Sequence, residues 1–71
     1  MKKKISIEGM SCQHCVNHVT EALKELEGVD KVEVSLEEKQ AVIESAKGIT
    51  DGDIKNAIEE VGYEVVGIEA L

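Results

Sequence analysis

The stretch CVNHVTEALKELEG, residues 15–28, provides the clearest indication of the fold. Four apolar residues recur in it at intervals of three, four and three positions: Val16, Val19, Leu23 and Leu26. This spacing places them in one stripe along an α-helix of 3.6 residues per turn, and Ala22 widens the stripe. Gly28 fits the C-terminal cap of such a helix. The pattern therefore predicts an amphipathic helix that packs one face against a core.

Short alternating stretches on both sides of this helix predict strands. Before it, Ile5 and Ile7 alternate with polar residues, and Gly9 ends the run. After it, alternation predicts a second strand with the apolar positions Val32, Val34 and Leu36. The charged residues 37–39 then supply a turn into a third strand, in which Ala41 and Ile43 face inward and Val42 faces outward.

The second half of the chain predicts one more helix and one more strand. Thr50 and Asp53 have the spacing of a capping box, and an apolar stripe follows them: Ile54, Ala57, Ile58 and Val61. Gly62 is placed to stop this helix, and residues 63–71 read as a strand with a possible bulge at Gly67. The order βαββαβ predicts an α+β, ferredoxin-like sandwich, in which a four-stranded antiparallel sheet carries two helices on one face. Residues 1–71 are expected to form a single domain.

Composition narrows the classes of function. The chain has 71 residues and a formal net charge of −7, which repels nucleic acid and anionic membranes. The basic start MKKK is not followed by the apolar run of a signal peptide, so we expect a cytoplasmic protein without a membrane anchor. In that compartment thiols stay reduced, and a close cysteine pair more often binds metal or performs redox chemistry than forms a structural disulfide.

Both cysteines lie in the segment GMSCQHC, residues 9–15. The two residues between Cys12 and Cys15 allow both sulfurs to reach one metal ion or each other. Cys15 falls in the first turn of the predicted helix, where unpaired N–H groups and the helix dipole favour the thiolate. Structural zinc sites and iron–sulfur clusters usually take four protein ligands, whereas a soft monovalent ion such as Cu(I) can be held by two thiolates. Such an incomplete site suits transfer of the ion.

The segment GMSCQHC, between a first strand and a helix, resembles the GMxCxxC signature of the heavy-metal-associated domain family. The whole chain is similar in length and element order to the small bacterial copper chaperones of that family, the CopZ type. The CQHC variant and the Gly62-Tyr63 pair also resemble that bacterial subgroup. The resemblance implies a cytosolic carrier, with no catalytic turnover, that binds Cu(I) through Cys12 and Cys15. It also implies delivery to the metal-binding domains of a copper-exporting P-type ATPase, or to a copper-sensing repressor, by shared thiolate coordination.

The neighbours of the cysteines are expected to support the loop. Met10 is interpreted as a core residue that braces the loop, because its flexible thioether fills gaps well. Ser11 leads into the helix. His14 and His18 are interpreted as solvated surface residues, although His14 remains an alternative auxiliary ligand. Tyr63 either shields the cysteine loop, the role that the resemblance supports, or simply covers the sheet edge.

Several alternatives stay open. Hg(II), Ag(I) and Zn(II) are alternative cargoes. A thiol–disulfide oxidoreductase is a less favoured alternative function, because the chain has no proline and is short for a thioredoxin-like unit. Because two thiolates per chain leave coordination positions of Cu(I) vacant, we expect the apo protein to be a monomer and copper to bridge two chains into a homodimer. Acidic clusters such as residues 59–60 are interpreted as solvated faces, and docking of a basic partner is a hypothesis that rests on the net charge alone.

Overall fold

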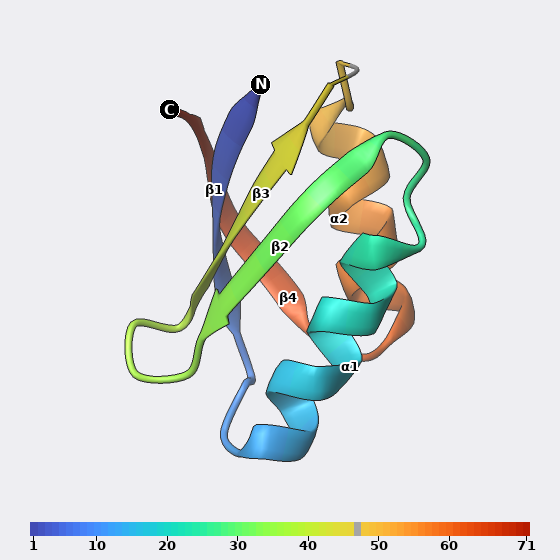
Figure 1. Cartoon of the computed structure of the whole chain (residues 1–71). Coiled ribbons are helices and arrows are strands. Elements are labelled where there is room, and N and C mark those ends of the chain that lie inside the picture. The colour runs from blue at the N-terminus through green and yellow to red at the C-terminus, as the bar shows by residue number, and fades with distance from the viewer. Residues whose placement is uncertain (47) are drawn as a thin grey trace.

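The computed structural model describes residues 1–46 and 48–71, and these form a sheet covered by helices on one face (Figure 1). The elements follow in the order β1 (Lys2–Glu8), α1 (Gln13–Lys24), β2 (Val29–Ser35), β3 (Gln40–Ser45), α2 (Asp51–Glu60) and β4 (Glu64–Ala70). The strands pair antiparallel in the order β2-β3-β1-β4, so β1 and β3 are central. The predicted ferredoxin-like βαββαβ fold is confirmed.

The core lies between the central strands and the two helices. Ile5 and Ile7 of β1 are 0% and 1% exposed, because alternate residues of a strand share a face and this face meets the helices. Ala41 and Ile43 of β3 are buried beside them, whereas Val42 lies half-buried on the outer face, as predicted. The helices contribute Val19 and Leu23 from α1, and Ile54 and Ile58 from α2.

Three expected boundaries differ from the structure. Helix α1 ends at Lys24, so Gly28 does not cap it; instead Gly28, at φ +94°, turns the chain into β2. Strand β2 ends at Ser35, which leaves Leu36 in the turn. Val61 is 37% exposed and not part of the buried stripe, because α2 ends at Glu60 and the chain reverses at Gly62, which has φ +94°.

Side-chain bonds fix the start of α2. Thr50 is the N-cap, and its Oγ1 accepts the N–H of Asp53 at 3.2 Å, as the capping spacing predicted. The Lys3 ammonium donates to the Ile49 carbonyl at 3.0 Å and to Asp51 Oδ1 at 2.6 Å. These contacts tie the first turn of α2 to the central strand β1, and so they hold the helix over the sheet.

An irregularity interrupts β4 near Gly67. Ser6 pairs with Gly67, but the next residue of β1, Ile7, pairs with Val65. Val66 is therefore the extra residue of a bulge, and it is 60% exposed. The bulge lies where the glycine predicted it, and beyond it the register returns Val65 to the core side.

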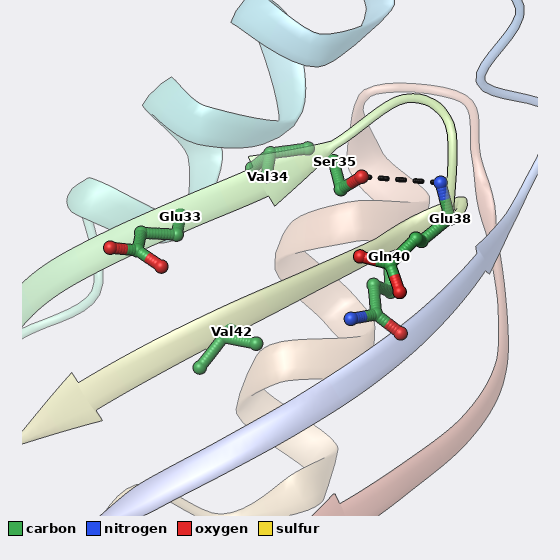
Figure 2. Close-up of a pocket in the computed structure, with 6 residues that line it drawn as sticks. All are labelled: Glu33, Val34, Ser35, Glu38, Gln40 and Val42. Atoms are coloured by element: carbon green, nitrogen blue, oxygen red, sulfur yellow. Dashed lines mark hydrogen bonds between the residues drawn. The ribbon is translucent and has the colours of Figure 1, made fainter.

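The hairpin between β2 and β3 bounds an open hollow of about 400 Å³ (Figure 2). Its lining comprises Glu33, Val34, Ser35, Glu38, Gln40 and Val42. Ser35 Oγ accepts the N–H of Glu38 at 3.1 Å, which closes the turn, and Lys39 takes a left-handed φ of 55°. No helix in the described part of the chain is long and apolar enough to cross a membrane.

The end of α2 gives a stability test. Ile58→Ala removes a fully buried side chain and should lower the free energy of unfolding by about 2–5 kcal/mol. Val61→Ala should change it by no more than about 0.5 kcal/mol, because the side chain is exposed. Urea unfolding of the apo variants measures both, and equal losses would contradict the observed end of the helix.

Candidate metal site

The loop between β1 and α1 carries both cysteines. Gly9 ends the strand at φ +97°, and Met10, 4% exposed, belongs to the hydrophobic core. Ser11 and Cys12 then come to the surface. The burial of Met10 anchors the loop from below, which agrees with the packing role expected for it and sets its side chain among aliphatic residues.

Helix α1 begins directly at the cysteine pair. Cys12 is its N-cap, with an extended backbone, and its carbonyl accepts the N–H groups of Cys15 at 3.0 Å and Val16 at 3.2 Å. The Cys12 side chain makes no capping hydrogen bond. A serine or aspartate at this position usually satisfies one of the free N–H groups. Here the side chain is left available for other chemistry.

The two sulfurs lie close enough to share one ligand. Cys12 Sγ and Cys15 Sγ are 3.4 Å apart, well beyond the length of about 2.05 Å of a disulfide bond, and both cysteines are free. A metal ion at the usual metal–sulfur distance of about 2.3 Å can contact both of them. Cys12 is exposed and Cys15 is half-buried, so the pair opens to solvent on the Cys12 side.

The surroundings favour a thiolate at Cys15 and hold its pKa at about 6, below the usual 9.0. Hydrogen bonding from the Tyr63 side chain is the largest cause, followed by the backbone of Ser11 and the Cys12 side chain, while burial opposes them. The first turn of α1 contains no acidic residue, so no carboxylate offsets the positive end of the helix. The same interaction raises the pKa of Tyr63 to about 12.

Tyr63 reaches this loop from the other half of the chain. The Tyr63 N–H donates to the Ile58 carbonyl at 3.3 Å, and the turn after α2 brings the ring over Gly9. A Cβ placed on Gly9 would lie 3.4 Å from Tyr63 Cδ1, so the bare glycine allows the ring to approach. The sequence predicts only that Gly9 ends the strand; this second role depends on Tyr63, which is 54 positions away in the sequence, so no local pattern indicates it.

The histidines are not gathered with the cysteines. His14 and His18 are both exposed on α1. Within residues 1–46 and 48–71, no group of three or more histidine, cysteine, aspartate or glutamate side chains is arranged to hold a metal ion. Among the described residues, the candidate donors that the structure brings together are thus the two sulfurs, with the Tyr63 hydroxyl and the Ser11 backbone as neighbours of Cys15.

A family model and several known proteins with similar sequences point to the same family. The model of the heavy-metal-associated domain matches residues 4–64. The copper chaperone CopZ of Staphylococcus epidermidis is 46% identical over 65 residues, which cover 90% of this chain and 96% of that protein. The mercuric reductase of Shewanella putrefaciens is 49% identical over 59 residues, or 83% of this chain, but the match spans only 11% of that protein.

Solved structures of the same fold include carriers and transporter domains. A CopZ metallochaperone superposes with a TM-score of 0.87 at 36% identity, covering 93% of this chain and all of that one. A copper binding domain from a P-type ATPase superposes with a TM-score of 0.84 at 32% identity, covering 99% of this chain and 100% of that domain. A free-standing carrier and a domain of a transporter thus share this fold.

The Tyr63 contact can be tested through the pH dependence of the cysteines. Tyr63→Phe removes the hydroxyl, so the pKa of Cys15 should rise from about 6 toward 9.0. The ultraviolet absorbance of the thiolate, followed against pH in the reduced apo protein, gives the midpoint. His18→Gln, an exposed change on the same helix, should leave the midpoint in place.

Stability should respond in the same pH window. Because the pKa of Cys15 is lower in the folded protein than the ordinary 9.0, the thiolate stabilises the fold fully above pH 9 and loses this contribution as the pH falls to about 6. The loss should be smaller in Tyr63→Phe. An unchanged thiol midpoint in that variant would refute the assigned cause.

Proposed function

Because the chain belongs to the heavy-metal-associated domain family, we propose that it is a cytosolic copper chaperone without catalytic turnover. Its cargo is Cu(I), held by Cys12 and Cys15. The observation that carries the proposal is the pair of free sulfurs 3.4 Å apart at the start of α1, one of them with a pKa of about 6. A soft ion prefers thiolates, and a thiolate already formed at neutral pH binds it without displacing a proton.

The openness of the site supports transfer rather than storage. Two sulfurs leave part of the coordination sphere of the ion free, and the exposed Cys12 side lets a thiolate of a second protein approach. The incoming sulfur bonds to the ion before one of the two cysteine sulfurs leaves. The ion remains Cu(I), so no electron is gained or lost, and the metal is never released into solvent.

The proposed recipients are the metal-binding domains of a copper-exporting P-type ATPase. Support comes from the copper binding domain of a P-type ATPase that shares this fold at 32% identity. Two domains of this fold that each present a cysteine pair at the surface can face one another with their sulfurs around one ion. A copper-sensing repressor is the other recipient that the family resemblance implies.

Mercury is the second candidate cargo. The match to part of a mercuric reductase favours it, and Hg(II) also binds two thiolates. Zinc is less suited, because its sites usually have at least three protein ligands and no third acidic, histidine or cysteine ligand is gathered here among the described residues.

A competition series distinguishes these cargoes. The reduced protein should retain Cu(I) against a strong chelator and bind Zn(II) far more weakly. Cys12→Ser or Cys15→Ser should abolish retention, whereas His14→Gln combined with His18→Gln should leave the copper stoichiometry unchanged, since both histidines are exposed. Circular dichroism of each variant checks the fold. Loss of copper from the folded histidine variant would make a histidine a ligand, and preference for Hg(II) over Cu(I) would reassign the cargo.

Copper should also change the oligomeric state. Because two thiolates leave coordination free, two chains can complete the coordination of shared Cu(I) ions, so the apo protein should be a monomer and copper should promote a dimer. Sedimentation velocity of the apo and loaded forms measures the mass directly. The dimer should dissociate when a competing thiol is added, and a monomeric loaded protein would refute the prediction.

A further inference from the structure

The two histidines of the chain lie together on the outer side of α1. His14 and His18 are four positions apart, and both are exposed. The helix buries Val16, Val19 and Leu23 against the core, and at 3.6 residues per turn both histidines fall on the opposite side. Side chains four positions apart on a helix are neighbours, with Cβ atoms about 5–6 Å apart. The two imidazoles therefore share one patch of the helix surface.

A neighbouring pair shows how closely such side chains meet on this helix. Gln13 and Asn17 are also four positions apart, shifted by one residue from the histidines, and Gln13 Nε2 donates to Asn17 Oδ1 at 3.3 Å. Two nitrogen ligands that each lie about 2.1 Å from a divalent ion, roughly at right angles, are about 3.0 Å apart. The reach observed for Gln13 and Asn17 is thus close to what a chelating pair at His14 and His18 requires.

The ring nitrogens of the two histidines are not used by the rest of the described structure. Neither side chain forms a hydrogen bond or an ion pair with residues 1–46 or 48–71. Glu21 follows His18 by three positions on the same side of α1, and its carboxylate has no ion pair with those residues either. The single lysine of this helix is Lys24, in the last turn. The net charge of −7 adds to this local field, so the surface attracts a cation.

We propose that His14 and His18 form a second metal site, which binds a divalent ion of borderline softness, Ni(II) or Cu(II), with water at its remaining positions. These ions favour tetragonal sites with nitrogen and oxygen ligands, whereas Cu(I) prefers thiolates. The second site is separate from the sulfurs, because His14 and Cys15 point about 100° apart around the helix. The chain then holds a soft monovalent ion at the loop and a divalent ion on the outer side of α1. This inference goes beyond the proposed function and does not depend on it.

Nickel binding by a chain without sulfur ligands tests this site. Cys12→Ser combined with Cys15→Ser leaves both histidines in place, and isothermal titration calorimetry of this variant should show one Ni(II) bound per chain. Adding His14→Gln or His18→Gln should weaken Ni(II) binding by about tenfold or more, at least the loss caused by removing a supporting partner of a metal ligand. Circular dichroism checks that each variant is folded. Binding that neither histidine substitution changes would overturn the proposal.

An exchange of two residues within α1 separates chelation from histidine content. Gln13→His combined with His18→Gln keeps the amino-acid composition and leaves both imidazoles at exposed positions. It places them at consecutive positions, however, and these do not face each other on a helix. In the variant without sulfurs, this exchange should weaken Ni(II) binding as much as the loss of one histidine. Equal affinity before and after the exchange would indicate an adventitious ion only and would contradict the proposed pair.

Two further measurements test the shared ligation and the independence of the two sites. Less than one equivalent of paramagnetic Ni(II) should broaden the proton NMR signals of both histidine rings together, and broadening of one ring alone would refute a shared ion. The copper-loaded protein with intact cysteines should take up one Ni(II) per chain and keep its Cu(I), whereas displacement of Cu(I) by Ni(II) would refute two separate sites. Failure to retain copper, with Ni(II) binding intact, would refute the proposed function and leave this inference standing.

Discussion

The burial of Ile5 and Ile7 on β1 is the constraint on which the rest of the structure depends. Strand β1 pairs with β3 on one side and β4 on the other, and it receives the Lys3 contacts that fix the start of α2. Its inward face is therefore determined by two ladders and two helices at once. Because the strand ends at Gly9, this same packing determines where the cysteine loop emerges and where α1 must begin.

The candidate metal site lacks the side-chain cap that would stabilise the start of α1, and the Cys12 sulfur stays free to react. A residue that bonds to the free N–H groups at an N-cap stabilises a helix by about 1 kcal/mol, and the Cys12 side chain makes no such bond. The dipole of α1 favours the thiolate of Cys15 instead, to which the Ser11 backbone also hydrogen-bonds. The two helices differ in this respect, since α2 is capped by Thr50 and has acidic residues in its first turn. The helix with the less satisfied N-terminus is the one beside the two sulfurs that we propose as metal ligands.

Much of the fold could be predicted from local patterns. The alternation at Ile5 and Ile7, the helical stripes and the Thr50 cap have physical causes that act within a few residues, and the structure agrees with each. The ends of elements were less predictable: Leu26 and Val61 continue their apolar stripes in sequence, yet both lie beyond the ends of their helices. A periodic pattern records which residues are apolar but does not determine where the chain turns away from the helix.

The sequence by itself determined the proposed donor atoms, since Cys12 and Cys15 are the only thiols and a spacing of three positions at a helix start brings their sulfurs together. Only the tertiary structure decided how reactive Cys15 is, because the Tyr63 hydroxyl that lowers its pKa arrives from the turn after α2. The same holds for the cross-strand pairing of Ile7 with Val65, residues that are separated by most of the chain. Such contacts depend on strand order and register, and these are set by the packing of the whole sheet rather than by any local stretch of residues.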